Sequence, residues 1–232
     1  MFFSGIQRFT LLDYPGRVAC ILFSPGCNMR CGFCHNMEFV LPEKIKKLRG
    51  TFIGEDAVYS FLQKRVGKLE AVVFFGFEPT QWPDIVCIME RVKNLGFLVK
   101  IDTNGSHPEI LRRILQKGIV DAVALDIKTS FDSYASLTGL DCGKSVCESL
   151  EILTGSGVWY ECRTTLIDEV HTNEILSFLL RDLSGVRRYA LQTFRPAHTL
   201  SSSFGSFHAF SSLRMNSFAS ACRNIIPEVI LR

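Results

Sequence analysis

Three cysteines, Cys27, Cys31 and Cys34, lie in the stretch 25–36 with the spacing CxxxCxxC. Three thiolates from one short loop can hold three irons of a four-iron cluster and leave the fourth iron without a protein ligand. An open metal position is where a substrate or cofactor binds, by the logic that separates catalytic from structural zinc sites. The spacing therefore predicts a catalytic iron–sulfur site.

Two other uses of these cysteines stay open. Cys31 and Cys34 could form half of a zinc site, supported by Cys27 or His35, or they could act as a redox dithiol. A structural zinc site usually needs a second paired element, and no such pair is present. We expect the remaining cysteines to be buried small apolar residues; they are Cys20, Cys87, Cys142, Cys147, Cys162 and Cys222.

Polar residues and glycines follow a series of apolar runs and could line one pocket. They are Gly76 and Glu78, then Asp102, Thr103 and Asn104, then Asp126 and Lys128, then Arg163, and finally His198. Each alone has an ordinary explanation as a turn, a helix cap, an ion pair or a surface histidine. Arg163 interrupts an apolar strand and needs a partner, either Asp126 or a ligand carboxylate. Convergent polar groups on an apolar scaffold are typical of a binding site.

The apolar runs that must position these residues read as parallel strands covered on both faces. We predict strands at 18–23, 71–75, 98–102, 122–126, 158–166 and 189–194, with helices at 53–66, 83–95, 108–117, 144–154 and 173–183. Strands alternating with helices predict an α/β fold with a parallel sheet of βαβ units. Six strands are too few for a closed eight-stranded barrel, so we expect an incomplete (β/α)6 TIM-type barrel.

Composition narrows the class of protein. The chain has 232 residues, of which 47% are hydrophobic, and we expect a single domain with a core at about 17–200 and a C-terminal cover at 201–232. A net charge of +3 with interspersed charges favours no nucleic-acid partner. The apolar runs are too short to span a membrane, and no signal peptide is apparent. Nine cysteines without an export signal indicate a reducing cytoplasm.

The order of these blocks resembles the activating enzymes of glycyl-radical enzymes, within the radical S-adenosylmethionine (SAM) superfamily. The resemblance runs from Asp-Tyr-Pro-Gly at 13–16 through Cys-His-Asn (34–36), Thr-Asn-Gly (103–105), Asp-Ile-Lys (126–128) and Arg-Thr-Thr (163–165) to Phe-Arg-Pro at 194–196. It is strongest to the activases of anaerobic ribonucleoside-triphosphate reductase, with those of pyruvate formate-lyase as near relatives. No ferredoxin-like cysteine block follows the first motif, which excludes the two-cluster branch.

This resemblance implies a role for each block. Cys27, Cys31 and Cys34 would ligate a [4Fe-4S] cluster whose fourth iron takes SAM, and Phe33 and His35 would lie along the adenine. The implied SAM pocket further comprises Gly76, Glu78, Asp102, Thr103, Asn104, Asp126, Lys128, Arg163 and His198, with a monovalent cation between the aspartates. Reductive cleavage of SAM would then make a radical that takes hydrogen from a glycine of the partner, with electrons from a flavodoxin- or ferredoxin-type donor.

Phe77 is the one departure from the family pattern. Relatives carry a Gly-Gly-Glu-Pro-type segment, and here the second glycine is Phe77. If that position needs positive φ or close backbone approach, phenylalanine would weaken SAM binding. Phe77 therefore leaves a second interpretation open, in which the chain is a non-catalytic homologue that holds a cluster without cleaving SAM. In that case Phe77→Gly would raise SAM affinity.

Overall fold

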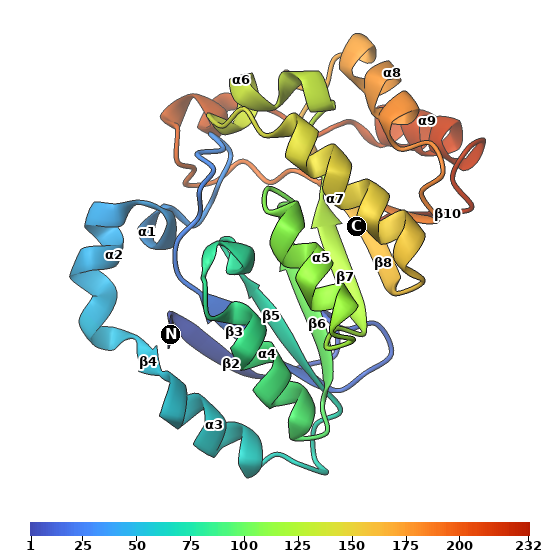
Figure 1. Ribbon diagram of the computed structural model, residues 1–232. Helices are drawn as coiled ribbons and strands as arrows, with labels where there is room; N and C mark the ends of the chain where they lie inside the picture. The colour runs from blue at the N-terminus through green and yellow to red at the C-terminus, as the bar shows by residue number, and fades with distance from the viewer. The chain divides into compact units, whose positions relative to one another are not determined.

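The computed structural model describes all 232 residues, and the chain folds into two compact units (Figure 1). Unit 1 comprises residues 1–28, 38–103 and 109–124, and unit 2 comprises residues 29–37, 104–108 and 125–232. The division passes through the cysteine loop, because Cys27 falls in unit 1 while Cys31 and Cys34 fall in unit 2. No helix is long and apolar enough to cross a bilayer.

Unit 1 is a mostly parallel sheet. Its main strands are β2 (Gly5–Thr10), β3 (Ala19–Ser24), β5 (Ala71–Gly76) and β6 (Leu98–Thr103), hydrogen-bonded in the order β2-β3-β5-β6. β2 is antiparallel to β3, and the others are parallel. A two-stranded ribbon pairs β1 (Phe2–Phe3) with β4 (Ile53–Gly54).

The helices of this unit join successive strands, as βαβ connectivity requires. They are α1 (Met37–Val40), α2 (Pro42–Leu48), α3 (Glu55–Gln63), α4 (Ile85–Asn94) and α5 (Pro108–Gln116), with short 3-10 turns η1 (Arg49–Thr51) and η2 (Pro79–Gln81). The helix expected at 53–66 is shorter because Ile53 and Gly54 pair with β1 instead. Inward side chains such as Ile21 and Val73 form one core cluster against Tyr14.

Unit 2 continues the βα pattern after β7 (Ala122–Asp126), the strand that leads from one unit to the other. Within it, β8 (Trp159–Leu166), β9 (Arg188–Thr193) and β10 (Glu228–Leu231) are parallel, with β9 between the other two. Its helical segments are η3 (Phe131–Ser133), α6 (Tyr134–Thr138), α7 (Gly143–Ser156), α8 (Asn173–Asp182), η4 (Ser202–Ser206) and α9 (Ser212–Arg223).

The α/β class with parallel strands is confirmed, and each of the six expected strands is present within one or two residues. The pairing of β3 with β5 places Ser24 opposite Gly76 at their carboxyl ends. The cysteine loop follows the first of these strands, and the Gly76–Thr80 segment follows the second. In parallel α/β sheets this edge is where functional residues gather.

Candidate active site

The second half of the cysteine loop belongs to unit 2 and is bound by a later segment of the chain. Cys31 is buried and Cys34 half-buried, and the Cys34 N–H donates to the Cys31 carbonyl at 3.0 Å. Leu200 N–H donates to the Cys34 carbonyl at 2.8 Å, and Ser201 N–H donates to the Gly32 carbonyl at 2.9 Å. We call residues 194–207 the strap, because this segment holds the loop by its backbone.

Aromatic side chains of the strap fit against the same half of the loop. A Cβ added to Gly32 would lie 2.3 Å from the Phe204 ring, so only glycine permits this approach. Phe33 lies beside Phe204 with ring centroids 6.1 Å apart. The His35 ring stacks on Phe194 at 6.2 Å, and its Nε2 lies 2.9 Å from the Arg195 carbonyl oxygen. The strap therefore fixes the direction in which Cys31 and Cys34 are presented.

The first half of the loop belongs to unit 1 and is bound differently. Gly26, which precedes Cys27, donates its N–H to the Phe39 carbonyl at 2.8 Å and accepts from the Glu78 N–H at 3.0 Å. Trp82 Nε1 donates to the Pro25 carbonyl at 2.8 Å. The segment entering Cys27 is thus clamped between α1 and the residues after β5.

Phe77 completes this clamp. Its ring stacks on Phe39, with centroids 5.4 Å apart and planes 14° from parallel. No residue other than glycine has a positive φ, so Phe77 has ordinary backbone geometry. The glycine requirement falls on Gly76, whose φ is +130° and whose added Cβ would lie 2.5 Å from the Ser24 carbonyl oxygen. The structural objection to Phe77, a need for positive φ, therefore does not apply.

Glu78 is the centre of a buried polar cluster in unit 1. Its Oε1 accepts from the Thr80 N–H at 3.0 Å, from the Thr80 hydroxyl, and from Thr103 Oγ1 at 2.7 Å. The side chain is fully buried, which is costly for a carboxylate without such partners. These bonds join the end of β5 to the end of β6. They hold one carboxylate rigidly where an ammonium group of a ligand could pair with it.

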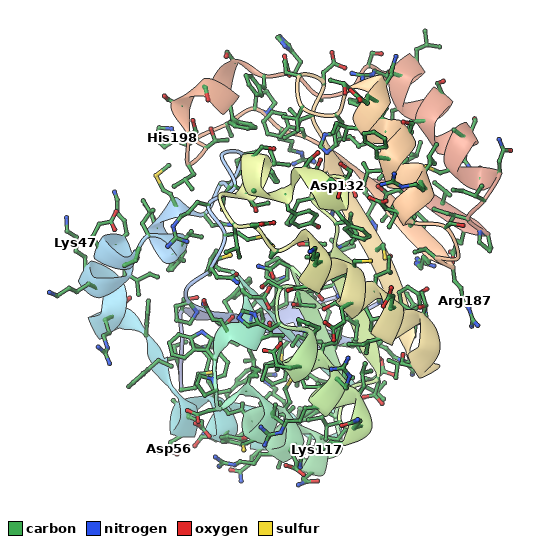
Figure 2. The ribbon with its side chains drawn as sticks, turned by 45° about the horizontal axis from the view of Figure 1, so that its top comes forward. Lys47, Asp56, Lys117, Asp132, Arg187 and His198 are labelled. Atoms are coloured by element: carbon green, nitrogen blue, oxygen red, sulfur yellow. The ribbon has the colours of Figure 1, made fainter.

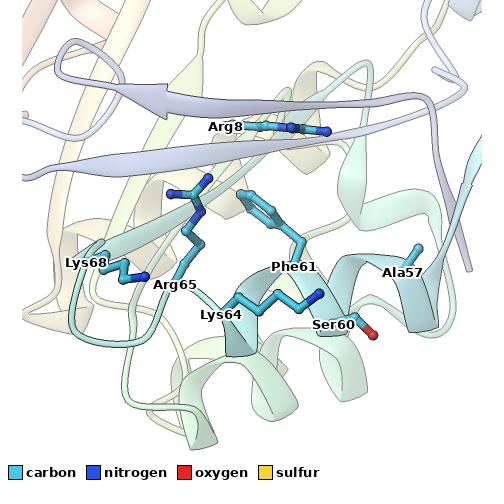
Figure 3. Close-up of a pocket in the computed structure, with 7 residues that line it drawn as sticks. All are labelled: Arg8, Ala57, Ser60, Phe61, Lys64, Arg65 and Lys68. Atoms are coloured by element: carbon cyan, nitrogen blue, oxygen red, sulfur yellow. The ribbon is translucent and has the colours of Figure 1, made fainter.

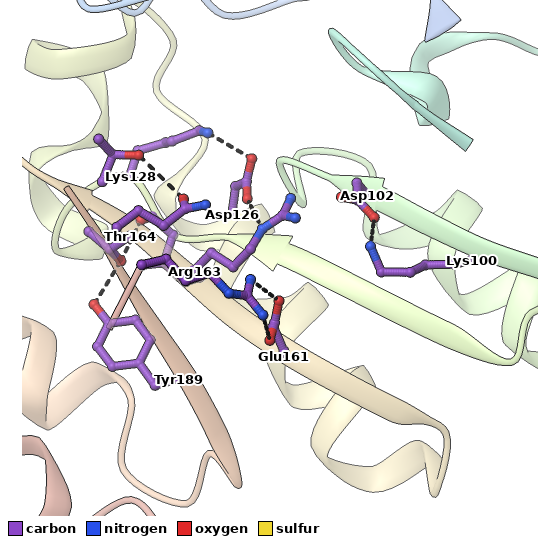
Figure 4. A network of polar contacts seen from close by, with 12 residues as sticks. Lys100, Asp102, Asp126, Lys128, Glu161, Arg163, Thr164 and Tyr189 are labelled. Atoms are coloured by element: carbon purple, nitrogen blue, oxygen red, sulfur yellow. Dashed lines mark hydrogen bonds and ion pairs between the residues drawn. The ribbon is translucent and has the colours of Figure 1, made fainter. Parts of the chain in front are cut away.

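Asp102 lies on β6 and forms a buried ion pair with Lys100 (Figure 4). Asn104 is also buried, and its Oδ1 accepts from the N–H of Ser106 at 3.0 Å and from the hydroxyl of Ser106 at 2.6 Å. Asn104 therefore closes a turn, and its place in the SAM pocket stays a prediction.

Asp126 is the centre of the corresponding cluster in unit 2. Lys128 Nζ donates to its Oδ2 at 2.9 Å, and Arg163 Nε donates to its Oδ1 at 2.8 Å (Figure 4). Burial alone would raise the pKa of Asp126, but Arg163 and Lys128 outweigh it and hold that pKa well below its usual range. Arg163 thus has the carboxylate partner that its place on an apolar strand required, and Asp126 stays anionic.

Cys31 is electrostatically linked to this cluster. Burial raises the pKa of its thiol to about 11, and the positive charge of Lys128 opposes that rise. Burial likewise pulls the pKa of Lys128 down, but Asp126 and Cys31 reverse the effect and raise it. Ligation of a metal by Cys31 would require loss of the thiol proton, and Lys128 would stabilise the resulting thiolate.

The donor set fits a cluster ligated by three thiolates. None of the nine cysteines is in a disulfide. No three His, Cys, Asp or Glu side chains already converge closely enough to hold a metal ion. Three soft sulfur donors on a glycine-containing loop are nevertheless the chemistry that iron–sulfur clusters use.

The burial of the remaining expected residues varies. His198 is exposed on the strap (Figure 2). Cys87 is exposed and Cys147 half-buried, so the expectation that all six remaining cysteines are buried was wrong for these two. Phe39, Phe204 and Ser24 were not identified from sequence, because their roles depend on contacts between segments far apart in the chain.

Comparison with known proteins identifies the family. The model of the radical SAM superfamily matches residues 21–179. The chain belongs to the radical SAM superfamily. The relatives of this chain include MJ1227 of Methanocaldococcus jannaschii, which is described as a candidate activating enzyme of a glycyl-radical enzyme. The two are 30% identical over 99% of this chain and 95% of that protein.

Two further similarities agree with this family. The pyruvate formate-lyase-activating enzyme of Clostridium pasteurianum is 27% identical over 84% of this chain and 82% of its own length. A domain of the pyruvate-formate lyase-activating enzyme from Bacteroides vulgatus has the same fold, with a TM-score of 0.56 and 14% identity over 70% of this chain and 98% of that domain. This radical SAM protein is an enzyme, and its cofactors are a [4Fe-4S] cluster and SAM.

Proposed function

We propose that this radical SAM enzyme generates a glycyl radical on a partner enzyme, and that the partner is an anaerobic ribonucleoside-triphosphate reductase. The supporting observation is the order of its sequence blocks, which extends over nearly the whole chain and includes the activase-like Asp-Ile-Lys and Arg-Thr-Thr segments. Similarity to MJ1227 over 99% of the chain supports the same class. We further propose a cytoplasmic setting and a flavodoxin- or ferredoxin-type electron donor.

In this proposal Cys27, Cys31 and Cys34 hold the cluster. When bound, the cluster and SAM supply one-electron cleavage of a carbon–sulfur bond that ends in removal of a hydrogen atom from the target. The Gly26 clamp holds the segment before Cys27 within unit 1, and the strap holds the segment with Cys31 and Cys34 within unit 2, so each part of the loop is ordered before the cofactor arrives. This preorganisation is the main contribution a protein makes to cofactor chemistry.

The surrounding polar residues bind and orient SAM. Glu78, held by Thr80 and Thr103, is placed to accept hydrogen bonds from the methionyl ammonium group. Lys128 and Arg163 present positive charge beside Asp126 and can attract a carboxylate. Phe33 and His35 are proposed to lie along the adenine. Asp102 already pairs with Lys100, and Asp126 already pairs with Lys128. The monovalent cation expected between the two aspartates stays a prediction.

The decisive experiment uses anaerobic protein that is reconstituted with iron and sulfide and then reduced by an added reductant in the presence of SAM. We expect 5′-deoxyadenosine, and a glycyl radical in the electron paramagnetic resonance (EPR) spectrum when the reductase is added. A brown cluster that never yields deoxyadenosine would contradict the proposal and leave the non-catalytic homologue. A colourless protein with one bound zinc would contradict both the proposed activity and the iron–sulfur cluster, and would indicate a structural zinc site.

A second candidate partner is pyruvate formate-lyase, which the similarity to the Clostridium pasteurianum enzyme favours. The same assay separates the two. Deoxyadenosine formation accompanied by a radical in pyruvate formate-lyase, and none in the reductase, would reassign the partner while keeping the chemistry.

A further inference from the structure

Unit 1 contains a hollow lined largely by cations, formed by β2, α3 and the segment that follows α3. Its volume is about 570 Å³. The lining residues are Arg8, Ala57, Ser60, Phe61, Lys64, Arg65 and Lys68 (Figure 3). Four of the seven are positively charged and none is negatively charged.

The hollow lies toward the amino ends of the parallel strands β3 and β5. Arg8 is on β2, between the positions that pair with Ile21 and Ala19 of β3. Lys68 precedes the first residue of β5. Glu78 instead follows the carboxyl end of β5, so the SAM chemistry proposed above does not account for these cations.

None of the four cations takes part in an ion pair with a carboxylate of the chain, although other cations of unit 1 do. Arg17 pairs with Glu70, Lys93 with Asp121 and Lys117 with Glu90. Of the acidic residues nearby in sequence, Asp56 is exposed and pairs with none of these cations, and the others are directed elsewhere. Glu70, two residues after Lys68, binds the Arg17 guanidinium at 2.8 Å and the Val18 N–H at 2.9 Å.

Glu55, at the start of α3, is also directed elsewhere. It binds Arg91 and, at 3.2 Å, the terminal ammonium group of Met1. The fold therefore uses Glu55 and Glu70 at other positions. The four cations of the hollow have no carboxylate partner in the chain, although Arg65 lies over the Phe61 ring at 5.4 Å from its centroid.

Helix electrostatics explains only part of this charge. Lys64 and Arg65 directly follow α3, and cations are favoured at the carboxyl end of a helix. Arg8 comes from a different element and faces Phe61 and Arg65 across the hollow (Figure 3). Like charges brought together from two elements repel, so an external anion would stabilise the arrangement.

We propose that this hollow binds a small anion carrying two or more linked phosphate groups. Two guanidinium groups offer the paired donors that match phosphate oxygens, and two lysines add point charges. A single negative charge would leave most of the four cations uncompensated. The volume is that of a small-molecule site, and the Phe61 ring and Ala57 give it an apolar wall.

The test is calorimetric titration of the cluster-loaded, full-length protein with inorganic tripolyphosphate, without oxygen and at about 0.1 M salt. We expect saturable binding of one anion per chain that saturating SAM does not alter. The double variant Arg8→Gln/Arg65→Gln should weaken binding about tenfold or more, since each lost guanidinium removes charge-assisted hydrogen bonds. Its circular dichroism should match that of the unsubstituted protein.

The matched control is Lys46→Gln/Lys47→Gln, which removes the same charge from α2, where Lys47 is exposed (Figure 2). This control should leave binding unchanged. Equal weakening in both double variants would overturn the proposal in favour of general electrostatic attraction. Absence of saturable binding, or competition with SAM, would also overturn it. Tighter binding of a single-stranded oligonucleotide, lost in the same variant, would replace it with a nucleic-acid site.

Discussion

The two ends of the cysteine loop are held by different kinds of interaction. The end before Cys27 is held locally, by Gly26 hydrogen bonds and by the stack of Phe77 on Phe39. The end with Cys31 and Cys34 is held by the strap, more than 160 residues later in the chain. The first end can therefore order with its neighbouring strands, whereas the second depends on completion of the fold, because distant contacts carry a larger loop-closure cost.

The largest expected effect is the same at both ends. Cys27→Ala, Cys31→Ala or Cys34→Ala should each abolish 5′-deoxyadenosine formation, because each removes one of the three proposed iron ligands. The matched control is Cys87→Ala, which removes an exposed thiol on α4. Deoxyadenosine production that survives in any of the three loop variants would remove that cysteine from the ligand set.

The next effect separates the ends. Gly32→Ala should destabilise the protein by about 1–3 kcal/mol and lower the iron retained, because its new Cβ overlaps the Phe204 ring. Adding Phe204→Ala should restore iron content, since the smaller side chain makes room. Urea unfolding and iron analysis measure both. An iron content in Gly32→Ala equal to that of the unsubstituted protein would show that the strap does not control the loop.

A smaller effect is expected at the other end. A double-mutant cycle of Phe39→Ala and Phe77→Ala should give a coupling energy of about 0.5–1.5 kcal/mol, as for other aromatic pairs. Phe77→Gly should lower stability and SAM affinity, because it removes the stack and frees the backbone. The SAM-induced change in the EPR spectrum of the cluster reports the affinity. A gain in affinity on Phe77→Gly would contradict this account of Phe77.

The smallest effect is a pH dependence specific to unit 2. His171 is buried, with Nε2 3.1 Å from the Lys128 carbonyl oxygen. Burial lowers its pKa, so its contribution to stability is complete well above the unfolded value of about 6.5. As the pH falls through that value the unfolded chain binds a proton first, and stability decreases until the folded pKa is reached.

Thermal unfolding between about pH 7.5 and pH 5 checks this expectation. The variant His171→Gln should show a flatter pH profile than the unsubstituted protein, whatever its absolute stability. Identical slopes for the two proteins would show that His171 does not titrate on unfolding.

Sequence alone predicted much of the fold because the buried strands have distinctive patterns. Continuous apolar runs such as Ala71–Phe75 can be satisfied only by burial on both faces. β2 and β10 escaped prediction, since β2 contains the polar pair Gln7 and Arg8 and β10 has only four residues. Strands without a continuous apolar run form because a partner strand is already in place, which is information that a local pattern does not contain.

The candidate site likewise has a part that the sequence predicted and a part that it did not. Spacing predicted the three cysteines as ligands, and the need of a buried charge for a partner gave Asp126 as one of two candidate partners of Arg163, which the structure shows paired. The doubt about Phe77 came from the second glycine of the Gly-Gly-Glu-Pro-type pattern. The backbone angles show a positive φ at Gly76 and none at Phe77, which the sequence could not show. The hold of the strap on Gly32 was not predictable, because it joins backbone groups whose sequence carries no signal.

The contact between Gly32 and Phe204 also constrains how the sequence can diverge. A larger residue at position 32 is tolerated only if position 204 becomes smaller. A sequence with large residues at both positions is destabilised by the overlap described above. The two positions should therefore covary among descendants of this chain. Position 204 should vary freely only in lineages that have kept glycine at position 32, which makes the order of substitutions itself predictable.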